Sequence, residues 1–187
     1  MTPFELLAPT YLQMLGALSN WLDKAERELP VAQMTALPSA RLAPDMFPLS
    51  TQVRFACAQA LEGVHRLHAI ALPPLHANLL EEGRKAGERP GSLGDARARI
   101  ADTISLVSAL SAGEGSDGTA EIAHELPNGM VFDLTSDQYS RDWALGQFYF
   151  HIMIAYAILR QQGVNLGKAD YVAHMFEYLR PGTRPTA

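Results

Sequence analysis

The chain has 187 residues, of which 48% are hydrophobic and 19% charged, and its formal net charge is −5. This length fits a single domain with a substantial core, and the composition excludes a chain that is disordered throughout. The acidic balance, without a basic cluster interleaved with aromatic residues, excludes nucleic acid and anionic membranes as main partners.

The cysteine content and the N-terminal residues predict the compartment. Cys57 is the single cysteine and cannot form an internal disulfide, which favours a reducing cytoplasm. The first basic residue is Lys24, so the N-terminus lacks the charged region of a signal peptide. The longest strongly apolar run, residues 148–159, is shorter than the roughly 20 residues that span a bilayer. We therefore expect a soluble, cytoplasmic protein.

The first predicted helix follows Thr2. Thr2, Pro3 and Glu5 form the pattern of a capping box with a proline in the first turn. Pro9 lies too far inside for a straight helix, so we expect a kink or a restart there. Apolar residues spaced alternately by four and three form one face, namely Tyr11, Leu15, Leu18, Leu22, Ala25 and Leu29.

A proline-rich connection, LPSARLAPDMFPLS, leads to a second helix that begins near Pro48 and ends by Pro73. Long ordered loops often cover a functional or core opening. We expect Met46 and Phe47 to be buried against one end of the bundle, because two large apolar side chains need cover. The inward stripe of this helix is Val53, Ala56, Ala60, Val64 and Leu67.

The stretch EEGRKAGERPG, residues 81–91, predicts an exposed connection because it is charged and rich in helix breakers. Ser92 and Asp95 then resemble a capping box for a third helix. This helix should end at SAGEGSDG, residues 111–118. Its apolar positions are Leu93, Ile100, Ile104, Val107 and Leu110.

Two alternating runs around Asn128-Gly129 predict a β-hairpin, which must lie against the helices because a lone hairpin is only marginally stable. A long helix follows, capped by Thr135 or Ser136 and ended by Gly163. A short helix over residues 168–179 should close the chain. The alternating residues are Ile122, His124 and Leu126 in the first run and Met130, Phe132 and Leu134 in the second.

Four main helices of similar length predict an all-α fold, an antiparallel four-helix bundle with a small hairpin before the last long helix. We expect one domain over residues 1–180 and a loose tail over residues 181–187. The long last helix is apolar on three faces, which predicts a homodimer if the hairpin and the final helix leave one face uncovered. That third face consists of Phe150, Met153 and Ala157.

Three stretches carry a resemblance: RLAPDMFPLSTQV at 41–53, FYFHIMIAYAILR at 148–160 and GVNLGKADYV at 163–172. In this order and spacing they resemble the domain-of-unknown-function family nineteen-ninety-three, which is grouped with the DinB/YfiT-like bundles. The resemblance covers most of the chain, from about residue 41 to 172. It implies a DinB-like antiparallel four-helix bundle, and it implies no reaction.

The wider DinB-like group includes members that hold a divalent metal with three histidines, one on the second helix and two, four residues apart, on the last main helix. In this sequence Gln147 and Ala155 stand four residues before and after His151, so neither supplies a second imidazole. The resemblance therefore implies no complete three-histidine site and no cofactor. The remaining alternative for zinc or nickel combines His151 with the HxxH pair His65 and His68.

Other readings of the histidines stay open. His151 shares a stripe with core residues, so we expect it to be buried, neutral and hydrogen-bonded, with a pocket role as the alternative. For His65 and His68 a solvated helix end is the alternative to metal binding. His76 joins them only if its loop folds back. The candidate ligand pocket consists of His151, Tyr156, Asp45, Gln52 and Trp143.

Three functions are compatible with the sequence, which does not decide whether the protein is an enzyme. The leading hypothesis is a small-molecule-binding or stress-associated protein. The second is a metal- or histidine-dependent transferase or hydrolase with a small substrate. The third is a dimerising scaffold without a ligand.

Two further residues are expected to have structural roles. Asp45 should cap the second helix or pair with Arg160, and Cys57 should act as a small core residue.

Overall fold

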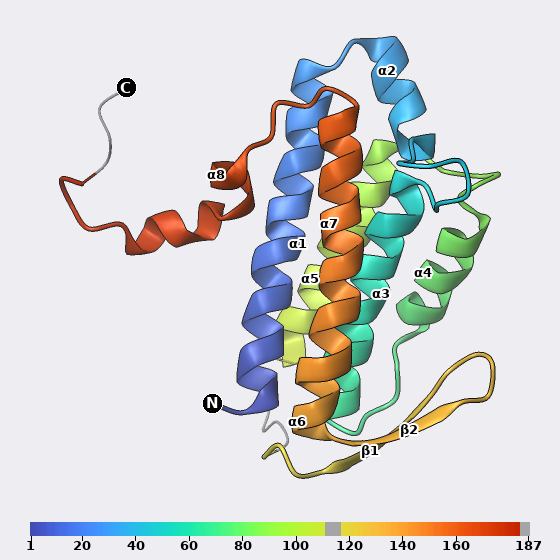
Figure 1. Ribbon diagram of the computed structural model, residues 1–187, viewed down its shortest axis with the longest axis vertical. Coiled ribbons are helices and arrows are strands. Elements are labelled where there is room, and N and C mark those ends of the chain that lie inside the picture. Colours follow the sequence, from blue (N-terminus) through green and yellow to red (C-terminus); the bar gives the residue numbers. More distant parts are fainter. Residues whose placement is uncertain (111–116, 184–187) are drawn as a thin grey trace.

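Four long helices form the body of the protein in this computed structural model, which describes residues 1–110 and 117–183. Figure 1 shows α1 and α7 running in one direction and α3 and α5 in the other, with α4 returning the chain between α3 and α5. The predicted all-α four-helix bundle is confirmed. The four helices are α1 (Pro3–Glu28), α3 (Leu49–Leu67), α5 (Leu93–Leu110) and α7 (Leu145–Gln161).

Helix α1 begins as its sequence predicts. The Glu5 amide donates to Thr2 Oγ1 at 3.2 Å, and the Thr2 amide donates to Glu5 Oε2 at 2.7 Å, which completes the capping box. The helix continues through Pro9, so the predicted restart is wrong. Pro9 is exposed, and the carbonyl that it leaves without a partner can bind water.

The connection before α3 contains the short helix α2 (Val31–Ala36) and the 3-10 turn η1 (Leu37–Ser39). Leu37 and Pro38 are buried, and η1 packs against α3. Phe47 is 51% exposed and lies edge-on to Phe55, so its predicted burial is wrong. The short helix and turn cover this end of the bundle without it.

Helix α4 (Pro74–Lys85) replaces the first half of the predicted exposed connection. Leu79 is fully buried, and Glu81 pairs with Lys85 one turn later. Glu82 accepts hydrogen bonds from two arginines of the bundle, Arg54 of α3 and Arg99 of α5. Some of the charges that predicted an exposed loop therefore form ion pairs between helices. The charge pattern alone does not distinguish an exposed loop from a helix with such pairs.

The predicted hairpin is present as β1 (Glu121–Glu125) and β2 (Val131–Thr135), paired antiparallel with Ile122 opposite Leu134. Gly129 has a φ of +84°, a conformation that glycine adopts without strain. Ile122 and His124 are buried, so this face of β1 points inward. Figure 1 shows the hairpin lying across the end of the bundle where α3 ends.

The chain enters the last long helix through α6 (Ser136–Gln138) and a π-helical turn, η2 (Tyr139–Ala144). Thr135 is the N-cap and forms a capping box with Gln138, as expected. Gly163 follows α7 with a φ of +92°, which confirms it as the residue after the C-terminus. None of the helices described in residues 1–110 and 117–183 is long and apolar enough to cross a membrane.

Beyond α7, two short elements take the place of the predicted helix over 168–179. These are α8 (Lys168–Tyr171) and the 3-10 helix η3 (Ala173–Tyr178). Val172 separates them with φ −101° and ψ 26°, outside the α-helical region. Residues 111–116 of SAGEGSDG and residues 184–187 of the predicted tail lie outside the described residues.

A glycine allows α1 and α3 to approach each other closely. A Cβ added to Gly63 would lie 2.9 Å from Cε2 of Tyr11, whose side chain is fully buried. We predict that Gly63→Ala lowers the free energy of unfolding by about 1–3 kcal/mol, because the packed ring cannot move away without cost. Urea unfolding measures this change.

Gly16, inside α1, is the matched control. A Cβ there meets no atom within 4 Å. Gly16→Ala should raise the free energy of unfolding by about 0.5–1 kcal/mol, because alanine loses less backbone entropy in a helix. Equal effects of the two substitutions would contradict the close approach at Gly63.

Candidate functional site

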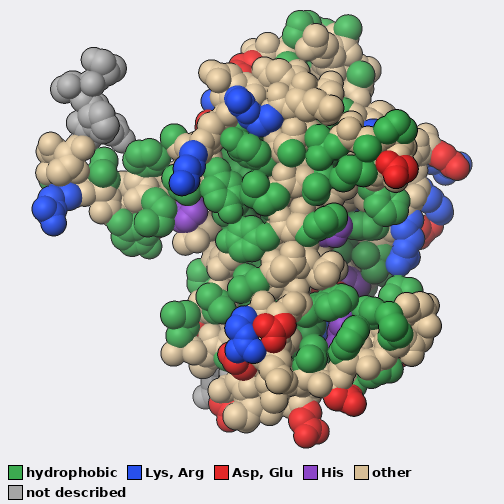
Figure 2. Space-filling model, viewed as in Figure 1, with side chains coloured by type: hydrophobic (Ala, Val, Ile, Leu, Met, Phe, Trp, Pro, Cys, Tyr) green, Lys and Arg blue, Asp and Glu red, His purple; other side chains and the backbone are tan. Residues whose placement is uncertain are grey.

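A cleft of about 510 Å³ opens where α3 ends, α4 begins, and the hairpin and η2 meet. This volume is in the range of pockets that bind small molecules. Figure 2 shows histidine side chains in the hollow between the hairpin and the helical body. The polar side chains used in the argument below are Gln59, Glu62, Arg66, His76, His124 and Trp143.

Glu62 and Arg66 form the charged part of this cleft. They lie one turn apart on α3, and Arg66 Nε donates to Glu62 Oε1 at 2.9 Å. His124, from β1, is 3% exposed and places Nδ1 3.8 Å from the same carboxylate oxygen. That distance is too long for a hydrogen bond. The imidazole therefore lies beside the ion pair without being bound to it.

The π-helical turn supplies the aromatic wall. The ring of Trp143 lies 4.6 Å from the ring of His124, and that of Tyr139 lies 5.5 Å from it, centroid to centroid. Phe132 of β2, the cross-strand neighbour of His124, also contacts Trp143, with 5.9 Å between ring centroids. The imidazole of His124 is thus held by ring contacts rather than by hydrogen bonds.

Several buried polar atoms of this cleft have no hydrogen-bond partner among the described residues. They are both ring nitrogens of His124, Nε2 of His76, Nε1 of Trp143 and Oε1 of Gln59. Buried polar atoms are paired in the great majority of cases, and each unpaired one costs about 1–3 kcal/mol. Because these atoms gather around one opening, the cleft is the candidate functional site.

Burial lowers the pKa of both cleft imidazoles below the ordinary value. For His124 the nearby Glu62 opposes this shift and Arg66 adds to it, and the same two groups act on His76 in the same directions. Both rings are therefore neutral at pH 7, and each offers one N–H donor and one acceptor nitrogen. Burial also raises the pKa of the Tyr139 hydroxyl, which stays protonated.

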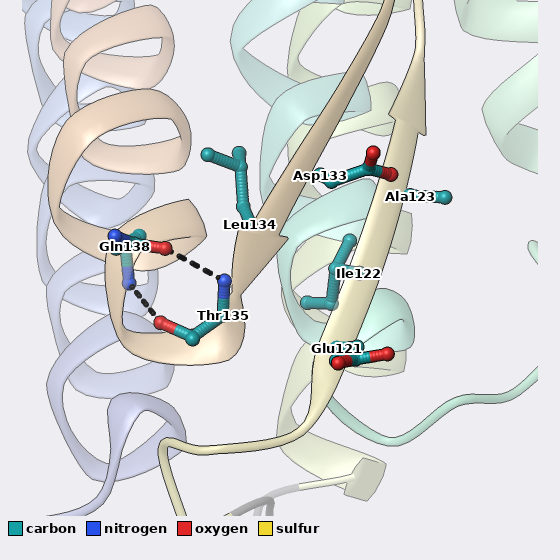
Figure 3. Close-up of a pocket in the computed structure, with 7 residues that line it drawn as sticks. All are labelled: Glu121, Ile122, Ala123, Asp133, Leu134, Thr135 and Gln138. Atoms are coloured by element: carbon teal, nitrogen blue, oxygen red, sulfur yellow. Dashed lines mark hydrogen bonds between the residues drawn. The ribbon is translucent and has the colours of Figure 1, made fainter.

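A second hollow, about 660 Å³ in volume, lies beside the hairpin (Figure 3). Thr135 and Gln138 line it, but their polar atoms bind each other in the capping box, as the dashed lines in Figure 3 show. Its remaining polar side chains are the carboxylates of Glu121 and Asp133. Without unpaired buried donors it is a weaker candidate than the cleft.

The comparisons with known proteins decide the family. A family model described as a domain of unknown function (DUF1993) matches residues 4–172. The chain belongs to the DUF1993 family. It is also similar to the crystal structure of a DinB family member protein from Shewanella denitrificans, with 32% identity and a TM-score of 0.70. The match covers 97% of this chain and 95% of that one. Curated proteins give no match.

In this DUF1993 chain, the predicted pocket residues do not form one site. Only His151 and Gln52 meet: His151 Nδ1 donates to Gln52 Oε1 at 2.9 Å. Trp143 belongs to the cleft at the other end of α3. Tyr156 packs against Trp21, and Asp45 is exposed and leaves the N-cap of α3 to Pro48.

His151 is half-buried, and its hydrogen-bond partner Gln52 is itself held by a second hydrogen bond. Gln52 Nε2 donates to the Phe47 carbonyl at 3.2 Å, which turns the amide oxygen toward the imidazole. The ring of Phe55 packs edge-on at 5.3 Å. Burial lowers the pKa of His151 to about 4, so the ring is neutral at pH 7.

The HxxH pair is bound to its own helix. His65 Nδ1 donates to the Leu61 carbonyl at 2.7 Å, and His68 Nδ1 donates to the Val64 carbonyl at 2.9 Å. His65 is buried, so the predicted solvated face is wrong for this residue.

The residues of the alternative metal set do not fit a metal site. Within residues 1–110 and 117–183, no three side chains of His, Cys, Asp or Glu are grouped around one ion position. His65, His68 and His151 therefore do not form a common ligand set. On the α7 side, His151 faces the amide of Gln52 rather than a second imidazole.

Sequence reasoning missed the cleft because its residues come from four separate elements. The sequence predicts His76 only as a possible metal ligand, whereas α4 brings it to the cleft with 8% exposure. His124 gave a usable signal. It alternates with Ile122 on the inward face of a predicted strand, where a histidine needs a reason to be buried.

The lowered pKa of His151 predicts a pH effect on stability. Its folded pKa of about 4 lies below the unfolded value of 6.5, so the unfolded chain binds the proton first as the pH falls. Stability is therefore lost between these values. We expect His151→Gln to lose about 1–2 kcal/mol less between pH 7 and 5 than the wild type.

Urea unfolding of both proteins across this pH range measures the difference. The substituted glutamine does not titrate, while the histidines of the cleft remain unchanged in both proteins and their contributions cancel. Parallel curves for wild type and His151→Gln would contradict a depressed pKa at this position.

Proposed function

We propose that this DUF1993 protein binds a small organic molecule in the cleft between α3, α4, the hairpin and η2. The observation that carries the proposal is the set of buried polar atoms, in the side chains that line this cleft, that have no partner among the described residues. A ligand that forms hydrogen bonds with these atoms offsets the free-energy cost of leaving them unpaired in the folded protein.

The chemistry of the wall defines the ligand class. Trp143 is a hydrogen-bond donor only, and each neutral imidazole supplies one more N–H. The ligand must therefore bring acceptor atoms such as a carbonyl oxygen, together with a donor group for the unpaired Gln59 Oε1. Apolar side chains also line the cleft, so the rest of the molecule should be apolar; they are Leu72, Leu80, Leu126 and Pro127.

The charge balance of the cleft favours an uncharged ligand. Glu62 and Arg66 already neutralise each other at 2.9 Å, and both imidazoles are neutral at pH 7. An ionised ligand would lose hydration on entering and would meet no unpaired buried counter-ion. Two further charged side chains, Arg84 and Glu125, line the cleft, but both are exposed to solvent.

Benzamide, benzoate and benzylamine form a matched set of probes, because they share one ring and differ in charge. We predict that benzamide binds, with benzoate and benzylamine at least about tenfold weaker, since only the neutral carbonyl compound satisfies the donors without a buried charge. Saturation-transfer NMR and titration of tryptophan fluorescence measure the binding.

His124→Phe tests the site itself. The substitution keeps an aromatic ring against Trp143 but removes both unpaired nitrogens, so benzamide binding should weaken at least about tenfold while the melting temperature stays equal or rises. His151→Phe removes an imidazole outside the cleft and should leave benzamide binding unchanged. Equal binding by wild type and His124→Phe, or no binding by any of the probes, would refute the proposed site.

A further inference from the structure

A stripe of α7 remains uncovered on the surface. Phe150 is 56% exposed and Met153 is 42% exposed. Gly146 and Ala157 continue the same line at helical spacing, so small residues border the two large ones. We call these four residues the α7 stripe. Figure 2 shows hydrophobic side chains gathered over this helix.

A second apolar surface lies on the segment after α8. Residues 172–183, which we call the C-terminal arm, extend away from the bundle in Figure 1. The arm exposes four large apolar side chains, and Phe176 alone is 47% exposed. These four are Met175, Phe176, Tyr178 and Leu179. Such exposure on an extended segment needs a partner surface.

The root of the arm is fixed to α1, which sets its direction. Lys24 Nζ donates to Asp170 Oδ1 at 3.0 Å, and Trp21 Nε1 donates to the Asp170 carbonyl at 3.2 Å. Tyr171 stacks on Trp21 with 6.2 Å between ring centroids. The arm therefore leaves the bundle from an anchored position and carries its apolar residues away from its own α7 stripe.

We propose that the C-terminal arm of each protein packs on the α7 stripe of a second copy, which forms a two-fold symmetric dimer. Six large apolar side chains are about half exposed and offer ~600 Å² per chain, given the ~150–250 Å² that large side chains bury. A stable interface needs roughly 800 Å² per partner, which the backbone and polar rim of the arm can complete. Aromatic residues and methionine are also those enriched in interface cores.

Sedimentation velocity of the full chain tests the association. The concentrations run from about 1 to 100 µM, which spans micromolar dissociation constants. We expect a species of twice the 20.4 kDa chain mass. A monomer at every concentration refutes the proposal. This outcome is independent of the ligand cleft, which lies at the hairpin end and includes no residue of the arm or the α7 stripe.

Single substitutions identify the two surfaces. Met153→Asp on the stripe and Phe176→Asp on the arm should each shift the protein to monomer with an unchanged melting temperature, because both side chains are exposed in the single chain. Met130→Asp is the matched control: this methionine is 51% exposed in the hairpin turn and should leave the dimer intact. If Met153→Asp separates the copies and Phe176→Asp does not, α7 packs on α7 and the arm contact is wrong.

Mixing the two variants gives the decisive result. A mixed dimer restores one complete contact, because the unaltered arm of the Met153→Asp chain meets the unaltered stripe of the Phe176→Asp chain. Neither variant alone retains such a contact. Native mass spectrometry, which separates the two masses, should show the mixed dimer in excess over both homodimers. Absence of the mixed dimer would overturn the arm exchange.

Discussion

Helix α3 is enclosed by other helices on all sides, and this enclosure determines where the polar groups of the protein meet. It packs against α1, α4, α5 and α7, so its polar side chains reach little solvent. Arg54 shows the consequence: its guanidinium is buried and donates to Glu82 of α4 at 2.9 Å. A buried charge is tolerated only with such a partner. Gln52 meets His151 for the same reason, and Glu62 meets Arg66.

The parts of the fold that depend on neighbouring residues could be predicted from the sequence. The capping boxes at Thr2 and Thr135 and the turn at Asn128-Gly129 depend on side chains within three or four positions of one another. The inward stripe of α3 likewise follows from helical periodicity alone. Helix α4 was not predicted because the charge of Glu82 is balanced across helices, by Arg54 and Arg99, at distances in sequence that no local pattern contains.

The candidate site was less predictable than the fold, for a physical reason. Its imidazoles, His76 and His124, come from a helix and a strand that have no sequence relation to each other. The π-helical turn adds a further non-local feature, because it presents Tyr139 and Trp143 to His124 where a regular helix was expected. Of the predicted pocket, only the pair Gln52 and His151 came together, since these two lie on facing helices.

Because α3 is enclosed, the reactivity of its buried cysteine measures how often the bundle opens. Cys57 is fully buried in this helix, and burial raises the pKa of its thiol to about 12. Because the thiolate is the reactive form, the folded protein resists oxidants and alkylating reagents at neutral pH. Modification then requires that α3 separate from its neighbours. The rate at which a thiol reagent, added in excess, labels Cys57 therefore reports how often the middle of the bundle opens, without an engineered cysteine.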